Sequence, residues 1–346
     1  MAERVTIVQV AARAGVAISS VSSALNDRPG VSPATRRRIL KAAEELGYVP
    51  SLRGRSLSSK RAFAVGLVVQ RDPNVLELDP FFASFIGGIE SVIGSRGYEL
   101  VLQMGSGQAE TLDRYRRLAA DRRVDGVFVS EIMIDDPRIP LLEDLRLPAV
   151  GINSDRSGFP FPSVRQDHRV GIERLAAHLV ELGHRKIAHI SGPREFVHAR
   201  HRETAWRAAL AALGADAGPV VEGDFTYAGG VRAADTLLAS ESGATAVMCA
   251  NDLMAIGFIA RALDLGLKVP GDVSVAGYDG IEMGGYVRPT LTTLKTSPRR
   301  LGAEAARLLL DSVDGRDVED MDIPPVELVV RTSTGVPAVD VLGGAA

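Results

Sequence analysis

Serine side chains gather on one face of the segment from Thr6 to Asn26, which reads TIVQVAARAGVAISSVSSALN. A helix that begins near Ile18 would leave Ser19 and Ser22, with Ser23, on its open side. Hydroxyl groups can bond to base edges and phosphates, and an isoleucine can contact a thymine methyl group in the major groove. The alternative is an ordinary pair of core helices with a surface cluster of serines. On these two helices alone, both interpretations stand.

Polar side chains also occur where several predicted strands end. Carboxylates and amides make up most of this set, with one glycine and one aromatic ring: Gln70, Asp72, Glu131, Asn153, Gly192, Asp224, Phe225, Asn251, Asp252 and Asp279. Because the carboxyl ends of parallel strands lie along one edge, we expect these side chains to converge there. Such groups suit a small polyhydroxylated ligand, with the Phe225 ring against its apolar face. Taken singly, each is equally explained as a helix cap or an exposed turn, and Asn251 and Asp252 are especially good caps.

Residue combinations that would support catalysis or metal binding are not found in the sequence. A glycine pair at Gly105 and Gly107 follows a strand, but Glu110 stands where a dinucleotide-binding motif needs its third glycine. His198 and His201 have no Cys, Asp or Glu nearby at a metal-binding spacing, so we expect them at the exposed start of a helix. We therefore predict a protein that is not an enzyme and has no cofactor or metal.

Three short helices are expected to carry the serine face. Thr6 with Gln9 three residues later is the capping-box pattern of a helix start, and Gly15 permits the turn before the second helix. Ser32 and Pro33 begin a third helix. This helix is expected to present Arg36, Arg37, Arg38 and Lys41 to solvent and to turn Ile39, Leu40, Ala43 and Leu46 inward. The pattern is typical of a helix-turn-helix headpiece.

Charge separates this headpiece from the rest of the chain. The 346 residues have a net charge of -3, but residues 1–61 hold 11 basic and 4 acidic residues, a balance of +7, and the remainder has -10. A basic segment joined to an acidic body is expected when the basic segment meets phosphates. The length indicates two or three domains. The single cysteine, Cys249, the strand-sized apolar runs and the lack of a signal-peptide core predict a cytoplasmic protein.

The segment from Gly47 to Arg61 is predicted to be a linker that becomes ordered only on DNA. Leu57 is an apolar residue in a basic and polar sequence. It could enter the minor groove as a wedge that kinks the duplex, while Arg53 and Arg55 bind phosphates. The alternative is that Leu57 packs on the next domain.

From Ala62 onward, short apolar runs alternate with amphipathic segments, which predicts a parallel α/β fold. The expected strands are 64–70, 98–104, 126–130, 148–152, 186–191, 220–223, 246–250 and 273–278. The expected helices are 82–95, 112–121, 171–182, 201–213, 228–239, 253–265 and 298–312. Because these strands are too many for one small sheet, we expect two doubly wound lobes. Trp206 and Cys249 are expected in the core.

Several longer motifs point to one family. They are VSPATRRRILKAAEELGYVP from Val31, RSL from Arg55, DPFF from Asp79, ELGHRKIAHISGP from Glu181, ANDLMAIG from Ala250, VPGDVSVAGYD from Val269 and PTLTTL from Pro289. With the first segment, they make the chain resemble the LacI family of bacterial transcription regulators from about Val5 to Pro337. The resemblance implies a dimer with a core like that of periplasmic sugar-binding proteins. It also implies three crossovers between the lobes, near Ser163, Thr292 and Pro324.

The resemblance implies roles for individual residues. Ile18, Ser19 and Ser23 fall where the family reads bases, and Leu57 falls on its minor-groove leucine. The expected DNA-binding set is Thr6, Ile18, Ser19, Ser20, Ser22, Ser23, Asn26, Arg53, Arg55 and Leu57. The expected effector-binding set is Asp72, Phe81, Glu131, Asn153, Arg202, Phe225, Asn251 and Asp279. The chain departs from the family at Ser23, a common arginine, and at Gly54, a common alanine. It departs again at Asp79, a usual asparagine, at Ala205, a usual glycine, and at Gly280, a frequent aspartate.

We therefore expect a repressor in which two chains bind operator DNA and a small effector, a sugar or related metabolite, controls them. The expected divisions are a headpiece at 1–49, a hinge at 50–61, a core at 62–338 and a tail at 339–346. Lobe one would hold 62–163 and 293–323, and lobe two 164–292 and 324–338. The tail has no heptads, which favours a dimer. The alternatives are a sugar-binding transport protein without a DNA role, which would need export, and an enzyme using Asp72, Asp252 and Asp279.

Overall fold

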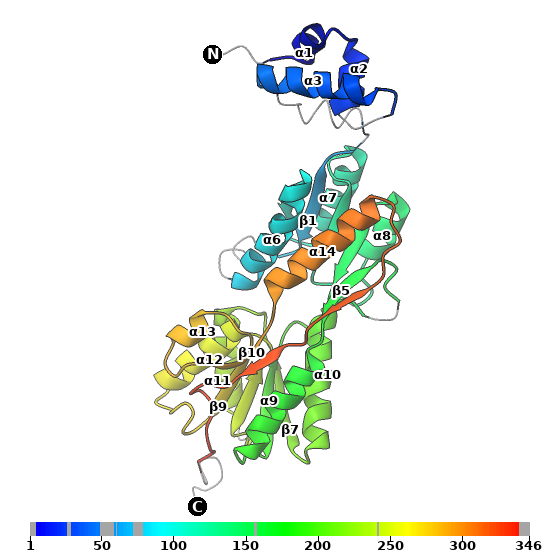
Figure 1. Cartoon of the computed structure of the whole chain (residues 1–346). Helices are drawn as coiled ribbons and strands as arrows, with labels where there is room; N and C mark the ends of the chain where they lie inside the picture. The colour runs from blue at the N-terminus through cyan, green and yellow to red at the C-terminus, as the bar shows by residue number, and fades with distance from the viewer. Residues whose placement is uncertain are drawn as a thin grey trace, which may run out of the picture. The chain divides into compact units, whose positions relative to one another are not determined.

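The computed structural model describes residues 5–25, 29–48, 59, 61–71, 79–155, 158–240 and 242–338. The chain separates into two compact units, Met1–Phe63 and Ala64–Ala346 (Figure 1). The predictions for Asn26, Arg53, Arg55, Leu57 and Asp72 lie outside the described residues, as do nearly all of the linker and the tail. Within the described part, no single helix is long and apolar enough to cross a membrane. The two short helices Ile7–Ala14 and Ile18–Leu25 meet that criterion only as a pair bent by 103°.

The first unit contains the three predicted helices, α1 Ile7–Ala14, α2 Ile18–Leu25 and α3 Pro33–Leu46. The Thr6 capping box forms as expected, and Gly15 ends α1 with a φ of 61°. Val10, Val21 and Ile39 are fully buried between the helices. The prediction for Leu40 is wrong because its side chain is 46% exposed. It lies about 100° around the helix from Ile39, and the smaller Ala42 takes the inward position instead.

The second unit contains two six-stranded sheets. In sheet order, the first is β11 Met321–Ile323, β5 Ser163–Gln166, β4 Ala149–Ile152, β3 Gly126–Val129, β1 Ala64–Val69 and β2 Glu99–Met104. The second is β12 Glu327–Val329, β10 Thr292–Lys295, β9 Ser274–Asp279, β8 Ala246–Cys249, β6 Lys186–Ser191 and β7 Asp216–Glu222. All neighbouring strands are parallel except β10 and β12. This arrangement confirms the predicted α/β class with two parallel-sheet lobes.

Helices cover both faces of the sheets. The helices of the first lobe are α6 Pro80–Ile93, α7 Gln108–Ala120, α8 Arg138–Leu145 and α14 Pro298–Val313, with a 3₁₀ turn at Gly94–Arg96. Those of the second lobe are α9 Arg169–Glu181, α10 Val197–Ala212, α11 Tyr227–Leu238, α12 Asp252–Asp264 and α13 Met283–Tyr286. In the second lobe, α11 and α12 form one core with the sheet, whereas α9 and α10 form another around Trp206, which is fully buried. Cys249 is also buried, as expected.

The chain crosses between the lobes a few residues after the first two positions that the resemblance implies, and around the third. Ser163 and Thr292 begin strands β5 and β10, which pair with β4 and β9 of the lobe that precedes each crossing. The chain therefore crosses after Gln166 and after Lys295, and a third time between β11 and β12 around Pro324. The first two predicted boundaries were early because a resemblance to a family does not define where such short strands end.

Other differences concern short or interrupted elements. Strands β5, β10, β11 and β12 and helices α8 and α13 were not predicted. Strand β7 begins at Asp216 rather than Val220, although it contains Gly218 and Pro219. It lies at the edge of its sheet and its pairing with β6 is irregular, and an edge strand tolerates a proline that a central strand would not. Helix α10 begins at Val197, before the predicted His201.

Candidate functional site

The candidate DNA-binding surface is the open face of α2 in the first unit. Ile18 is 48% exposed although it is apolar, and Ser19 is exposed beside it. Ser20, Ser22 and Ser23 are half-buried on the same helix. Thr6 is engaged in capping, because its backbone N–H donates to Gln9 Oε1 at 2.7 Å and its hydroxyl accepts from the Gln9 N–H at 3.4 Å.

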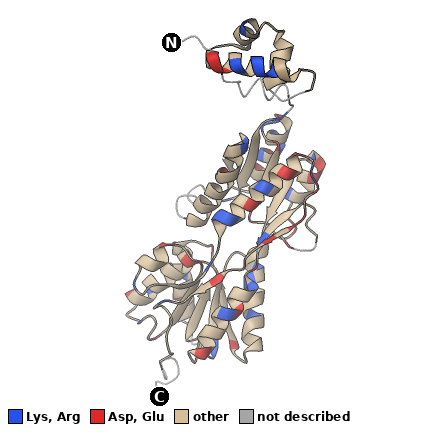
Figure 2. Ribbon diagram, viewed as in Figure 1, with Lys and Arg blue, Asp and Glu red and all other residues tan. Residues whose placement is uncertain are grey.

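Basic residues are spaced along α3 of the same unit (Figure 2). Arg37, Arg38 and Lys41 are exposed, as the sequence predicted, whereas Arg36 is half-buried and donates to the Ala24 carbonyl at 3.3 Å. Arg36 therefore links α3 to the end of α2. A helix that exposes Ile18 and Ser19 and is held by an arginine-rich helix is suited to binding duplex DNA, a polyanion whose base edges can be read.

The candidate effector site is a pocket between the two lobes of the second unit. Its walls come mainly from loops that follow strands: Arg71, Asp79, Phe81, Phe82, Ser130, Glu131, Ile152, Asn153, His198, Arg202, Phe225, Asn251 and Asp279. Every predicted effector residue within the described part of the chain lines this pocket. Four of them, Glu131, Asn153, Phe225 and Asp279, have a positive φ where the chain leaves its strand. Positive φ values at non-glycine residues tend to cluster at functional sites.

Two carboxylates expected at this edge lie elsewhere. Asp224 accepts from Thr226 and pairs with Arg232 outside the pocket. Asp252 is fully buried, where it accepts from the Thr293 hydroxyl at 2.5 Å and the Ile281 N–H at 2.8 Å. Because both carboxylates are occupied by neighbouring groups, their role is to hold loops.

Sequence reasoning did not assign Arg71 and His198 to the pocket. Arg71 lies between two residues that the strand-end pattern did identify, Gln70 and Asp72, and the same pattern could have included it. His198 was wrongly placed at an exposed helix start. Its ring stacks on Phe196 and Phe225, with centroids 5.6 and 5.4 Å away. Burial lowers the pKa of His198 well below its usual value, and the positive charge of Arg202 lowers it further.

Acidic and basic side chains balance each other in the pocket. Burial raises the pKa values of Asp79, Glu131 and Asp279, and the positive charge of Arg71 opposes the rise at each of them. Arg202 donates to the Ala250 carbonyl at 2.6 Å, and its guanidinium carbon lies 3.7 Å from the Tyr278 ring centroid. Three carboxylates with two guanidinium groups form a polar site that favours ligands rich in donors.

The amide side chains of the pocket are already hydrogen-bonded. Asn251 caps α12 by accepting from the Met254 N–H at 3.0 Å, and it donates to the Phe225 carbonyl at 2.8 Å. Asn153 accepts from the Gln166 N–H at 2.9 Å. Both amides therefore hold the loops that form the pocket. For Asn251, this is the helix-capping role expected from the sequence as the alternative to ligand binding. Among the described residues, no group of three or more His, Cys, Asp or Glu could hold a metal ion.

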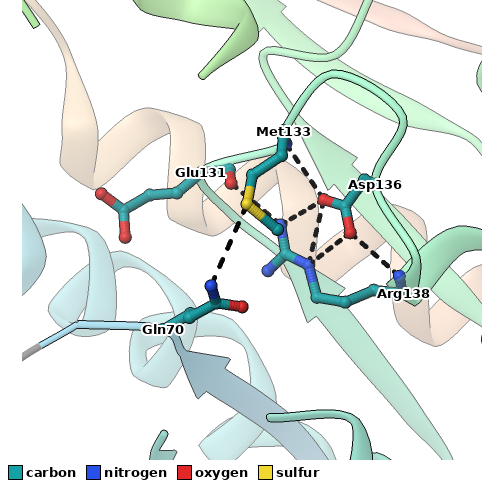
Figure 3. A network of polar contacts seen from close by, with 5 residues as sticks. All are labelled: Gln70, Glu131, Met133, Asp136 and Arg138. Atoms are coloured by element: carbon teal, nitrogen blue, oxygen red, sulfur yellow. Dashed lines mark hydrogen bonds and ion pairs between the residues drawn. The ribbon is translucent and has the colours of Figure 1, made fainter. Parts of the chain in front are cut away.

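A buried ion pair fixes the loop that carries Glu131 (Figure 3). Arg138 and Asp136 are 2.6 Å apart with side chains only 1% exposed. Arg138 also donates to the Glu131 carbonyl at 2.9 Å, and the Met133 N–H donates to Asp136 at 3.0 Å. These bonds hold Glu131 in its left-handed conformation, with its side chain directed into the pocket.

The same loop joins the two lobes. The Ile134 N–H donates to the Glu195 carbonyl at 2.8 Å, and the Val197 N–H donates to the Ile132 carbonyl at 2.9 Å. We call this strand-like contact between 132–134 and 195–197 the interlobe clasp. A second contact joins Asp155 of lobe one to His201 of lobe two at 3.0 Å. The lobes are therefore closed on the pocket.

Gln166 connects all three crossovers. Its side-chain oxygen accepts from the Ser297 N–H at 3.0 Å, and its side-chain nitrogen donates to the Pro324 carbonyl at 2.9 Å. Its own N–H donates to Asn153, which lines the effector pocket. A cavity of about 530 Å³ lies beside these crossovers and is lined in part by His168 and His201. Movement of the lobes would therefore act on a hinge that is tied directly to the pocket.

Comparisons with known proteins agree with both units. Residues 6–51 match the model for bacterial regulatory proteins of the lacI family, and residues 176–334 match a periplasmic binding protein-like domain. The chain is 35% identical to the HTH-type transcriptional regulator CelR of Thermobifida fusca, over 95% of this chain and 96% of CelR. It is 34% identical to the HTH-type transcriptional repressor PurR of Vibrio atlanticus strain LGP32, over 95% of this chain and 98% of PurR.

Solved structures extend the comparison to the fold. The alignment with a CelR–cellobiose complex has a TM-score of 0.74 and 34% identity, and it covers 95% of this chain and 100% of the chain in that complex. A lac repressor dimer bound to operator and the anti-inducer ONPF has a TM-score of 0.81 with 30% identity, over 96% of this chain and 100% of its own. The chain thus belongs to the lacI family of bacterial regulatory proteins, and it is a DNA-binding transcription regulator rather than an enzyme.

Proposed function

We propose that this regulator is a cytoplasmic homodimer that represses transcription at a near-palindromic operator, and that a small metabolite bound between the lobes changes its affinity for DNA. The observation that carries the proposal is the convergence of strand-end side chains in one interlobe pocket. The pocket belongs to a chain that also has a helix-turn-helix unit. A binding protein without a DNA role would not need that unit.

Within the DNA-binding unit, we assign base reading to α2. Ile18 contacts a thymine methyl group, and Ser19 and Ser23 bond to base edges. Ser20, Ser22, Thr6 and Asn26, together with Arg53 and Arg55, bind the phosphate backbone, which supplies affinity. Leu57 is the proposed minor-groove wedge. Because Ser23 has no guanidinium, it cannot make the bidentate contact with guanine that an arginine makes.

Within the core, we assign the effector to the pocket between the lobes. Arg202 and Asp279 bind polar groups of the ligand, Phe225 covers its apolar face, and Phe81, Glu131 and Asn153 complete the walls, with Asp72 beside them and Asn251 holding the Phe225 loop. CelR was solved with cellobiose. By analogy, a sugar or related metabolite is the class to test first. A ligand that binds better to one arrangement of the lobes shifts the population toward it.

Operator selection from a random duplex library tests the DNA-binding role. The full chain should enrich a near-palindromic sequence, as expected when protein and site share a twofold axis. Ile18→Ala should weaken binding to that sequence, by on the order of 1 kcal/mol for each methylene group removed from the apolar contact. Leu25→Met, at a half-buried position on the inner side of the same helix, serves as the control. A library without enrichment would overturn the proposal.

Effector control is tested on the selected operator. Sugars and related metabolites are added to the complex, and the change in operator affinity is followed by fluorescence anisotropy. At least one should change the affinity, and the change should be lost in Phe225→Ala while binding to operator remains. Control that persists in Phe225→Ala would remove this pocket as the effector site.

A further inference from the structure

Arg71 occupies the aromatic part of the effector pocket. Its guanidinium carbon lies 5.4 Å from the ring centroid of Phe196 and 5.0 Å from that of Phe225. Glu131 forms an ion pair with Arg71, and both charged side chains are only 11% exposed. We call the space bounded by Phe196, Phe225 and Glu131 the cation slot. Aromatic faces and a carboxylate together are the environment that binds a planar cation.

The cation slot retains unused bonding capacity. Oε2 of Glu131 and Nε of Arg71 are buried and have no hydrogen-bond partner among the described residues. Buried polar atoms without partners are unusual and call for an explanation. A carboxylate can accept two parallel N–H bonds from a guanidinium, but Glu131 uses one of its oxygens here. The slot could therefore bind a cation with better geometry than Arg71 provides.

Little space remains beside Arg71. The pocket has about 70 Å³ free, which is small compared with the ~300–1,000 Å³ of a typical ligand site. The interlobe clasp holds the walls together, through the Ile134–Glu195 bond and the Val197–Ile132 bond. Arg71 precedes the 79–93 segment of lobe one and belongs to no helix or strand. A ligand can therefore displace Arg71 without unfolding a helix or strand.

The charges around Arg71 determine which kind of ligand can replace it. Arg71 opposes the effect of burial on three carboxylates, Asp79, Glu131 and Asp279. If a neutral ligand displaced Arg71, Asp79 and Asp279 would keep Arg202 as a positive neighbour, but Glu131 would lose its ion pair and keep only the charge of Arg138, which is itself paired with Asp136. Leaving one member of a buried ion pair alone is strongly unfavourable. A ligand that brings its own positive charge avoids this cost.

We propose that the cation slot binds a small organic cation, an amine or guanidine that exchanges with Arg71, and that the effector carries such a group. The proposal rests on the proposed function, in which the effector binds between the lobes, and it specifies the chemistry of that effector. Arg71 is then an internal competitor. It fills the slot in the absence of effector and leaves it when the effector enters.

Removing the competitor tests the proposal. In full-length Arg71→Ala, methylguanidinium at low millimolar concentration should bind and raise the melting temperature, followed by calorimetry and scanning fluorimetry. Methylurea has the same shape without the charge and should bind at least about tenfold more weakly. The wild-type chain should also bind methylguanidinium at least about tenfold more weakly than Arg71→Ala, because its own guanidinium fills the slot.

Two further variants locate the binding. Adding Glu131→Gln to Arg71→Ala should abolish the preference for methylguanidinium over methylurea. Arg117→Ala, whose side chain is 75% exposed on α7, should behave as the wild type. If Arg71→Ala does not fold, Arg71→Gln vacates the same position with a shorter uncharged side chain and is scored in the same way.

Equal binding of the two probes by Arg71→Ala, or equal binding of methylguanidinium by the variant and the wild type, would overturn the proposal. Absence of binding by both proteins would also overturn it. Operator selection does not depend on Arg71. A chain that selects an operator but fails these tests would therefore lose the cation slot alone, and the proposed function would remain.

Discussion

Arg202 is the cation that the effector pocket retains when Arg71 leaves. It donates to the Ala250 carbonyl, stacks on Tyr278 and opposes the effect of burial on Asp279. We expect Arg202→Ala to abolish the response to effector without weakening operator binding, because Arg202 lies in the second unit. Calorimetry of effector binding and anisotropy of operator binding measure the two properties separately. Retained effector affinity in Arg202→Ala would remove this assignment.

Asp252 should make stability depend on pH. Burial raises its pKa from 3.8 to about 7 in the folded protein, although the bonds from Thr293 and Ile281 oppose the rise. Between these pH values the folded state binds more protons than the unfolded state. The contribution of Asp252 is therefore greatest below about pH 4 and is lost as the pH rises to about 7, by on the order of a few kcal/mol.

Urea unfolding of the wild type and Asp252→Asn checks this expectation. The variant keeps a polar side chain that can accept from Ile281 and donate to Thr293, but it does not titrate. Between about pH 5 and pH 8, the wild type should lose free energy of unfolding relative to the variant. A difference between the two proteins that does not change with pH would show that Asp252 has an ordinary pKa.

For single residues, the sequence predicted which side chains lie at the pocket better than it predicted what each of them does there. Glu131, Asn153 and Asp279 reach the pocket because parallel strands bring their carboxyl ends to one edge, whereas Arg202, which only the resemblance assigned, reaches it from helix α10. Asp252 follows the same rule but turns into the core. Whether a strand-end carboxylate faces ligand or core depends on the loop that receives it, and that loop comes from a distant part of the sequence.

Helices α6 and α14 pack through glycines, and this contact fixes lobe one. A methyl group added at Gly302 would lie 2.1 Å from the Phe85 carbonyl oxygen, which is backbone and cannot move aside. We expect Gly302→Ala to lower the free energy of unfolding by about 1–3 kcal/mol, as overpacking does. Gly94→Ala is the matched control, because Gly94 has a helical φ of -58° with nothing within 4 Å. If Gly94→Ala lost as much free energy of unfolding as Gly302→Ala, the close contact between α6 and α14 would be ruled out as the cause.

The loop that carries the interlobe clasp depends on one buried ion pair. Arg138→Met leaves Asp136 buried without its partner and removes the bond to the Glu131 carbonyl. We expect a loss of about 3–5 kcal/mol in the free energy of unfolding. The double variant Arg138→Met with Asp136→Leu has no unpaired charge at this place, so it should recover part of that loss. Chemical denaturation of the three proteins measures it, and a fully tolerated single variant would contradict the role of the pair.

Long elements with a clear period were predictable, and short ones were not. Strands β1 and β8 are continuous apolar runs, as buried parallel strands are. Strands β5, β10, β11 and β12 have three or four residues each and no alternation that distinguishes them from loops. They form because neighbouring strands offer them partners. That dependence on partners is also why the crossover positions could not be derived.

At the scale of the whole molecule, the uneven charge was the most informative property of the sequence. The first 61 residues carry +7 and the remainder -10, and the helix-turn-helix unit lies in the basic part. The α/β repeat was sufficient to predict two lobes and the edge where ligands bind. The strand-end pattern could have included Arg71 in the pocket, but its contact with Phe196 and Phe225 could not be predicted, because that contact depends on loops from both lobes.

The affinity of the full chain for its selected operator, compared with a scrambled duplex of the same length and composition, tests the central claim most directly. Both affinities are measured by anisotropy over a series of salt concentrations. We expect the selected duplex to bind at least about 10³-fold more tightly at physiological salt, and both affinities to fall as the salt concentration increases. Equal affinity for the two duplexes at every salt concentration would contradict it.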